Sequence, residues 1–255
     1  MIELEYFKLF VLVLARFSGL IVSAPILGSA NFPMPAKAGL SALAALVLTP
    51  VLGLPDAPLP DETFAFAAYG AGEFLIGLLL GFVMTLVFAA IQLAGQVIDL
   101  QTGFGMMNVF NPALETQFPI FGFFLFIIGV LYLLVINGHH LMIQALVATY
   151  DHVPVGGFVA RPALLLDVAG LGQGIFVEGL MLAAPLAAAM LLAYVTMGLL
   201  GRVVPQIHLF VVGFPLTIAT SLFLLALSIG VYLAALDGMF GRMFRNVDAL
   251  IRALG

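Results

Sequence analysis

The sequence predicts an all-α integral membrane protein built of long helical hairpins. Hydrophobic residues make up 64% of the 255 residues and charged residues only 8%, whereas a soluble domain carries about 25% charged residues. The mean hydropathy is +1.23, and long apolar runs recur along the whole chain. Such runs are expected to be helices, because an open strand would leave its backbone polar groups unpaired in lipid.

Proline, glycine and polar residues divide the chain into six apolar segments. They are expected at residues 6–24, 36–54, 66–102, 118–149, 170–200 and 206–236. A membrane-spanning helix needs about 20 residues, so the longer third and fourth segments are predicted to tilt, kink or project beyond the lipid. Residues 1–255 are expected to form one domain, because no charged or low-complexity tail indicates a second.

The charge distribution gives conflicting predictions of topology. The acidic N-terminus predicts an outside location, and Arg242, Arg245 and Arg252 predict a C-terminus inside. Six crossings would instead place both ends on the same side. Either one segment is a re-entrant hairpin, or the chain is held mainly by other proteins, and we favour the second explanation. The net charge of -5 and the scattered basic residues give no basis for nucleic-acid binding.

Five ionisable residues are expected within or at the ends of the apolar segments, where charge is costly unless it is paired or faces water. They are Glu73, Asp99, Glu178, Arg202 and Asp237.

Two helix faces combine a carboxylate with small residues. Glu73, Gly77 and Gly81 follow one another at i, i+4 and i+8, and Gly170, Gly174 and Glu178 repeat this spacing in reverse order. Glycines spaced in this way allow a second backbone to approach closely. Ordinary helix packing explains both patterns. The alternative is a pair of carboxylates that bind a partner's arginine or line a water-filled path.

A polar stripe ends the third segment. Gln92, Gln96, Asp99 and Gly103 lie at i, i+4, i+7 and i+11, and Gln101 lies close to them. These side chains are not expected to point into lipid. The stripe therefore predicts a face that packs against neighbouring helices or lines the lumen of an assembly.

An apolar loop follows the stripe. Gly103 and Gly105 are expected to end the helix, and Pro112 prevents its immediate resumption. Between them lie Phe104, Met106, Met107, Val109 and Phe110. Methionine adapts to irregular gaps. The residues alone leave two alternatives open: a loop buried against the protein's own core, or a deformable apolar constriction that gates a pore.

Signals of catalysis are weak. His139 and His140 are adjacent and are expected to point to different helix faces, and cysteine is absent. The sequence contains no HExxH pattern, no GxSxG nucleophile elbow, no P-loop and no Rossmann fingerprint. The sequence therefore predicts a protein that is not an enzyme and binds no cofactor or metal.

Several sequence blocks carry a family resemblance. They are RFSGLIVSAPILG at 16–28, GEFLIGLLLGF at 72–82, GQVIDLQTGF at 95–104, NGHH at 137–140 and GRVVPQIHLFVVGFP at 201–215. Together they resemble the FliR/SctT family of type III secretion export-gate subunits. The last block is the most specific, since it is similar to the family's Arg-x-x-Pro-Gln-x-Asn-x-Phe motif. The matching residues are Arg202, Pro205, Gln206 and Phe210, with Gly213 and Pro215 in an ending typical of flagellar members. His208 and Asn111 depart from the family pattern, which usually has asparagine and aspartate there.

The resemblance implies a non-enzymatic core subunit of the flagellar export gate, in the bacterial inner membrane at the flagellar basal body. It implies a helical assembly with FliP and FliQ, around which FlhB wraps and beside which FlhA lies. Unfolded flagellar substrates would pass through its centre, and the loop at 103–118 would lie in the lumen and help to plug the pore.

Three alternatives are kept beside this reading. One is an SctT-like subunit of a virulence injectisome. Another is a self-contained proton-coupled transporter that uses Glu73, Asp99 and Glu178 as a relay. A passive scaffold is the third.

Overall fold

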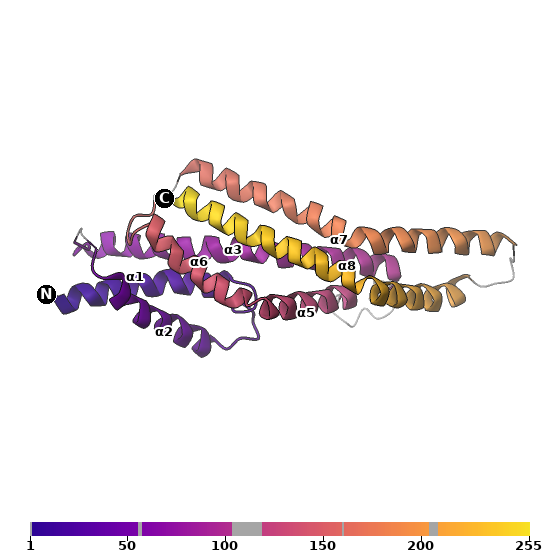
Figure 1. Ribbon diagram of the computed structural model, residues 1–255, viewed down its shortest axis with the longest axis horizontal. Helices are drawn as coiled ribbons and strands as arrows, with labels where there is room; N and C mark the ends of the chain where they lie inside the picture. Colours follow the sequence, from indigo (N-terminus) through magenta and orange to yellow (C-terminus); the bar gives the residue numbers. More distant parts are fainter. Residues whose placement is uncertain (1, 56–57, 104–118, 160, 204–208) are drawn as a thin grey trace. The chain divides into compact units, whose positions relative to one another are not determined.

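The computed structural model describes residues 2–55, 58–103, 119–159, 161–203 and 209–255, and in these ranges the regular structure is α-helical (Figure 1). The helices are α1 (Ile2–Ser23), α2 (Met34–Leu52), α3 (Thr63–Thr102), α5 (Ile120–Val135), α6 (Gly138–His152), α7 (Pro162–Val203) and α8 (Leu209–Leu254). Five of them are long and apolar enough to cross a membrane, and α5 with α6 adds a sixth candidate span. The predicted all-α membrane class is confirmed.

The fourth predicted segment is broken rather than continuous. Asn137 adopts a left-handed conformation with φ of 55°, and its carbonyl accepts the N–H of His140 at 3.0 Å. The axes of α5 and α6 are bent by 67° at this point. The length of this segment predicted a tilt, a kink or a projection beyond the lipid, and the structure has a kink at Asn-Gly 137–138, which is a turn signal. A pair bent in this way is either a broken span or a re-entrant loop, so the re-entrant explanation of the topology stays open.

The last helix extends well beyond its predicted end at residue 236. The continuation is amphipathic, because apolar side chains return at helical spacing on one side while the arginines face outward. The buried side chains are Met239, Phe240, Met243, Val247, Leu250, Ile251 and Leu254. With 46 residues in α8 and 42 in α7, these helices exceed a bilayer as α3 does with 40.

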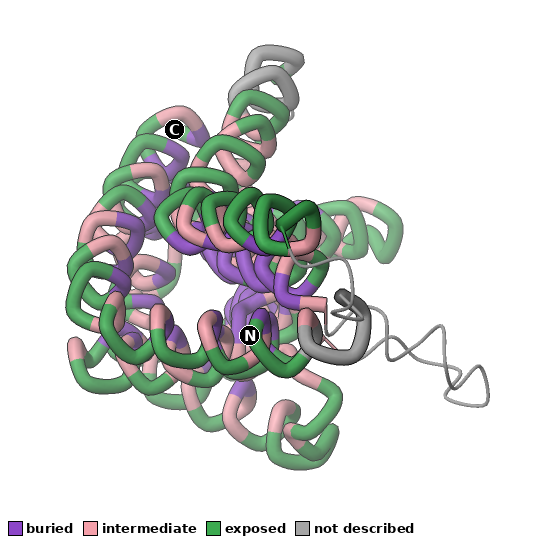
Figure 2. The backbone as a smooth tube through the Cα atoms, turned by 90° about the vertical axis from the view of Figure 1, so that its right-hand side faces the viewer, coloured by how far each residue is buried: buried purple, intermediate pink, exposed green. Residues whose placement is uncertain are grey.

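The described chain forms two compact units. One comprises residues 1–86, 134–171 and 241–255, and the other comprises residues 87–133 and 172–240. The helices α3, α7 and α8 each contribute residues to both units. Buried positions recur along the helices between half-buried and exposed ones (Figure 2).

In the first unit, α1 packs closely against the first half of α3 (Figure 1). A Cβ added to Gly77 would overlap the carbonyl oxygen of Arg16, and one added to Gly81 would overlap the hydroxyl of Ser23. A Cβ on Gly19 of α1 would overlap the carbonyl oxygen of Phe74. The backbones can approach this closely only because glycine has no side chain. Gly77 and Gly81 therefore pack within the chain, as expected for ordinary helix packing.

The connection between α1 and α2 contains a strained turn. Ile26 has φ of 71°, which is an outlier for a β-branched residue. The N–H of Leu27 donates to the carbonyl of Pro25 at 2.8 Å, so Ile26 is the centre of a γ-turn of the rare strained type. The ammonium of Lys37 donates to the carbonyl of Gly28 at 3.0 Å and ties this connection to the first turn of α2.

In the second unit, aromatic rings join the second half of α3 to α5 and α8. The ring of Phe88 lies 5.6 Å from those of Phe126 and Phe240, and Tyr132 stacks on Phe240 at 6.0 Å. Phe88 and Phe240 are buried. This cluster fixes one end of the α3–α5 pair, and the other end carries the candidate site.

Candidate functional site at the end of α3 and the start of α5

Asp99, in the last turn of α3, is buried with 5% of its surface exposed. Its Oδ1 accepts the N–H of Phe121 at 3.0 Å, and its Oδ2 accepts the N–H of Gly122 at 3.1 Å. Both donors lie in the first turn of α5, where backbone N–H groups have no partner within the helix and carry partial positive charge. The carboxylate therefore caps a helix that begins 21 residues later in the chain.

A glycine pair brings the two helices together beside Asp99. A Cβ on Gly95 would overlap the backbone of Gly122, so the chains are close to backbone contact there. Farther along, a Cβ on Gly129 would lie 3.0 Å from the side chain of Ile91. The start of α5 therefore packs on the row of α3 formed by Ile91, Gly95 and Asp99 at i, i+4 and i+8.

The end of α3 is held by hydroxyl groups from two other helices. The Tyr194 hydroxyl of α7 donates to the carbonyl of Gln101, and the Thr217 hydroxyl of α8 donates to the carbonyl of Thr102 at 3.1 Å. These carbonyls belong to the last turn, which has no further N–H groups in the helix to accept from. Gly103 follows with φ of 88°, the left-handed conformation that commonly ends a helix.

The predicted polar stripe is divided by the structure. Gln92 and Gln96 are exposed on a row next to the one that α5 covers, whereas Asp99 is buried. Gln101 is partly buried, and its Oε1 has no hydrogen-bond partner among the described residues. Of the predicted plug residues, Gly103 is the one described. Phe104, Gly105, Met106, Met107, Val109 and Phe110 lie outside the described residues.

The other carboxylate of α3, Glu73, is part of a buried ion pair. Its Oε2 accepts the Nε–H of Arg16 at 2.5 Å, and both side chains are fully buried. Its Oε1 accepts the N–H of Gly156 at 2.8 Å. The Arg16 guanidinium thus neutralises the Glu73 carboxylate, and the Gly156 N–H supplies a second hydrogen bond, as a charge placed away from water requires.

Arg16 makes further contacts with the end of α6 and the residues after it. The guanidinium donates to the Thr149 hydroxyl at 2.7 Å and to the Val153 carbonyl at 3.1 Å. Its central carbon lies 3.9 Å from the ring centroid of Tyr150, a cation–π geometry. Sequence reasoning omitted Arg16 from the ionisable residues of the apolar segments. The signal was present, because Arg16 is the one charged residue between Lys8 and Lys37.

The remaining predicted charged residues lie on the last two helices. Glu178 is partly exposed, and the adjacent Gly179 packs closely on α3 beside Leu93. Arg202 is exposed near the end of α7. Asp237 is exposed and accepts the hydroxyl of Tyr132 at 2.9 Å. The structure does not gather these side chains into one site.

The glycine and motif predictions have mixed outcomes in the described chain. Gly170 and Gly174 would each meet nothing within 4 Å if a Cβ were added, in contrast to the glycines of α3. Pro205 and Gln206 lie outside the described residues, and the side chain of Phe210 is not described. Gly213 and Pro215 lie in α8, where Gly213 is partly buried and Pro215 is exposed.

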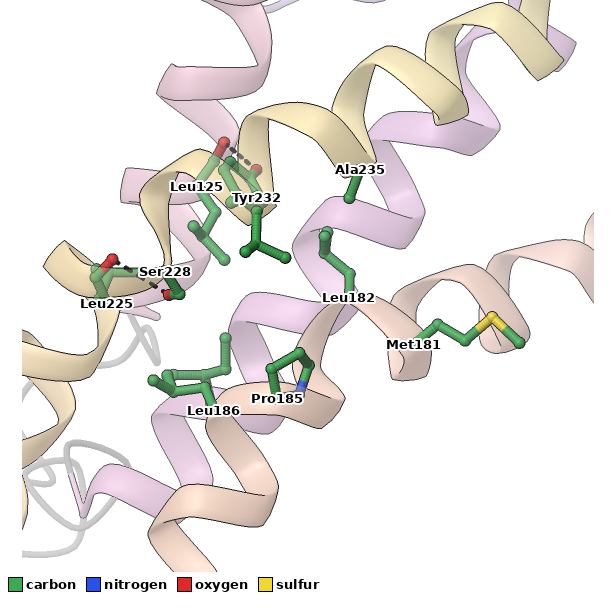
Figure 3. Close-up of a pocket in the computed structure, with 11 residues that line it drawn as sticks. Leu125, Met181, Leu182, Pro185, Leu186, Leu225, Ser228, Tyr232 and Ala235 are labelled. Carbon is green, nitrogen blue, oxygen red and sulfur yellow. Dashed lines mark hydrogen bonds between the residues drawn. The ribbon is translucent and has the colours of Figure 1, made fainter.

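A small apolar pocket of about 70 Å³ lies among α3, α5, α7 and α8 in the second unit (Figure 3). Its lining includes Leu125, Pro185 and Leu186. The hydroxyl groups of its lining are already engaged, since Tyr232 donates to the carbonyl of Leu125 at 2.9 Å and Ser228 to that of Leu225 at 3.2 Å. The pocket therefore presents mainly apolar surface. In the described ranges, no group of three His, Asp or Glu side chains is placed to hold a metal ion.

These features define a multi-pass helical membrane protein whose buried polar groups join its own helices. A sequence model of the family described as bacterial export proteins, family 1, matches residues 7–243. The flagellar biosynthetic protein FliR of Escherichia coli (strain K12) is 33% identical over 253 residues, covering 98% of this chain and 95% of that protein. FliR of Bacillus subtilis (strain 168) is 28% identical, with 99% and 98% covered. FliR of Pectobacterium carotovorum subsp. carotovorum is 32% identical, with 94% and 90% covered.

The chain belongs to this family of bacterial export proteins and, within it, groups with the FliR proteins. The family resemblance of the sequence blocks is thereby confirmed. The chain is a multi-pass inner-membrane subunit of the flagellar export apparatus, and its apolar helices agree with that location. Relatives named FliR cover nearly the whole chain, so the flagellar alternative takes precedence over the injectisome one.

Proposed function

We propose that the chain is a non-enzymatic core subunit of the flagellar export gate. In this proposal it forms, with FliP and FliQ, the channel for unfolded flagellar proteins, and residues 103–118 contribute to the pore plug. FlhB and FlhA are its expected neighbours. Family membership supports the export role, and the geometry at the end of α3 supports the role of the loop.

The observation that carries the proposal is the anchoring of the two ends of this connection. Asp99 bonds the start of α5, while Thr217 bonds the last carbonyl of α3. The connection, whose sequence is rich in methionine, phenylalanine and glycine, therefore starts and ends at one fixed place. An adaptable apolar segment whose two ends are held in place suits a deformable seal.

Exposed apolar rows on α7 and α8 support assembly with other subunits. Leu191, Val195 and Leu199 form one such row on α7, each more than half exposed. Only 22% of the apolar window of α7 and 11% of that of α8 is buried within the chain. Surfaces of this kind need lipid or the helices of neighbouring subunits against them.

The same contacts argue against a self-contained proton relay. Glu73 is fully buried and neutralised by Arg16, and both oxygens of Asp99 accept backbone N–H groups. A relay carboxylate has to exchange protons with water or with the next group of the path. Neither carboxylate is placed for that exchange in the described chain.

The test of the plug is an ion-leak measurement on the assembled gate. Cells that co-express the chain with FliP and FliQ should leak small ions when residues 106–110 are deleted or when Met106 and Met107 are replaced by serine. The matched control replaces the exposed Met34 and Met181 by serine, which should leave the leak unchanged. An intact complex in which the loop variants leak no more than the controls would refute the plug.

The test of the assembly role is co-purification. The complex with FliP and FliQ should purify as one species, and the exposed Gln92 and Gln96 should become protected from solvent in it. Labelling of a cysteine introduced at position 96 reports this protection, since the chain contains no cysteine of its own. A chain that purifies alone and catalyses proton-coupled uptake would replace this proposal with the transporter alternative.

A further inference from the structure

We propose that Asp99 is a positioning residue, whose charged carboxylate sets the separation between the two ends of the 103–118 connection. This inference rests on the proposed function insofar as it concerns the gate. Its structural part stands on the described residues alone. The polar stripe had suggested contact with a neighbour or with the lumen, whereas the carboxylate is turned to another helix of the same chain.

A carboxylate suits this place because of the number of bonds it can accept. Each oxygen takes one N–H from the first turn of α5, and the two donors are consecutive, at Phe121 and Gly122. An asparagine would offer one acceptor oxygen and would turn its NH₂ group toward the second N–H. A leucine of similar size would pack against the glycine pair but would accept neither bond.

The charge of Asp99 is stabilised by backbone groups. Phe121 and Gly122 donate main-chain N–H groups to it, and no basic side chain is among its hydrogen-bond donors in the described chain. The start of a helix carries partial positive charge, which favours an anion at this position. If helix packing were the only requirement, apolar residues would meet it without the cost of desolvating a charge. A fixed starting point for α5 is what the carboxylate adds.

The hydrogen bonds at the end of α3 hold the first end of the connection in place. The last two carbonyls of α3 are bonded by side chains of α7 and α8, so the end of α3 is fixed to those two helices. Asp99 then fixes α5 to α3, and Gly95 allows the two backbones to meet. Asp99 thus fixes the second end of the connection, at the start of α5, to the first end, which α7 and α8 already hold.

The strength of this link predicts the size of the effect. Losing one hydrogen bond to a charged group shifts the equilibrium between a held and a released start of α5 by roughly 10-fold to 100-fold. Asp99→Asn should lose about one such bond, and Asp99→Leu should lose both. The order expected for both spacing and export is therefore wild type, then Asn, then Leu.

The experiment measures the separation of the two ends with spin labels. Cysteines introduced at Leu100 and Ile120, both exposed, carry the labels in the full chain co-expressed with the neighbouring gate subunits. Asp99→Leu should reduce the dipolar broadening between the labels, and Asp99→Asn should reduce it less. The control is Asp237→Asn, which removes another carboxylate of the same unit that bonds a tyrosine and should leave the broadening unchanged.

Each outcome bears on the inference. Broadening in Asp99→Leu equal to that of the wild type overturns it. If Asp99→Leu does not accumulate in membranes, Asp99→Asn carries the test, and an Asn spectrum identical to the wild type overturns the inference. Reduced broadening supports the inference. A measurement of flagellar export in the same variants then distinguishes the positioning role of Asp99 from the proposed gating role of the connection. Reduced broadening with normal export upholds the position of Asp99 and contradicts the gating role of the connection.

Discussion

Replacing Arg16 by methionine should destabilise the chain by about 3–5 kcal/mol, because it leaves the Glu73 carboxylate buried without its counter-charge. Methionine keeps much of the apolar stem of the side chain, so lost packing contributes little. Glu73→Leu should cost a similar amount for the reciprocal reason. Both side chains are fully buried, and solvent therefore cannot screen the charge that is left.

The double variant Arg16→Met/Glu73→Leu gives the sharper test. It removes both charges together, and replacing a whole buried pair by apolar residues is often close to neutral. Here the Val153 carbonyl and the Gly156 N–H also lose their partners, at about 1–3 kcal/mol each. We therefore expect the double variant to cost about 4 kcal/mol less than the sum of the single variants.

The assay is unfolding of the purified chain in mixed micelles with increasing SDS, followed by far-ultraviolet circular dichroism. Circular dichroism suits this chain because it contains no tryptophan. The exposed Arg252→Met is the matched control and should lie within about 0.5 kcal/mol of the wild type. Strictly additive single variants, or an Arg16→Met cost below about 1 kcal/mol, would mean that water reaches the pair and would refute the reasoning.

Three further changes follow from the packing and are measured by the same unfolding assay. Gly77→Val should cost several kcal/mol or prevent folding, because its side chain meets the backbone of α1, whereas Gly170→Val meets open space in the isolated chain and should not. Ile26→Gly should stabilise the chain by about 0.5–1 kcal/mol, since glycine adopts the positive φ of the γ-turn without strain, and an unchanged stability would show that the turn relaxes. Thr217→Val should cost about 1 kcal/mol through the lost bond to the last carbonyl of α3, and no loss would show that water or another donor replaces the hydroxyl.

The sequence was sufficient for the class, the approximate limits of the first three helices and the close approach at Gly77 and Gly81. These depend on local composition and on the periodicity of one helix, which a single sequence displays directly. The length of the fourth segment predicted a tilt, a kink or a projection beyond the lipid, but it did not predict which of these occurs or where the kink lies. Asn137 and the glycine after it marked that position, and they had been read only as part of a family block.

The partners of the buried charges could not be predicted, because they are set by the fold. Arg16 and Glu73 are 57 residues apart, and nothing in their local spacing indicates that α1 and α3 meet at these two positions. For Asp99 the difficulty was of another kind. Periodicity placed it with Gln92 and Gln96, but which row of a helix is covered depends on the neighbouring helix, and α5 covers the row that contains Asp99.

The two carboxylates of α3 together limit how this subunit can bind its neighbours. Each is satisfied within the chain, Glu73 by an arginine and Asp99 by the start of a helix. Neither has a free charge to offer a partner. On α3, contacts outside the chain are therefore left to neutral groups, among them the exposed Gln92 and Gln96. Contacts made through such neutral groups depend on close packing and on single hydrogen bonds, so they should be far less sensitive to salt than ion pairs.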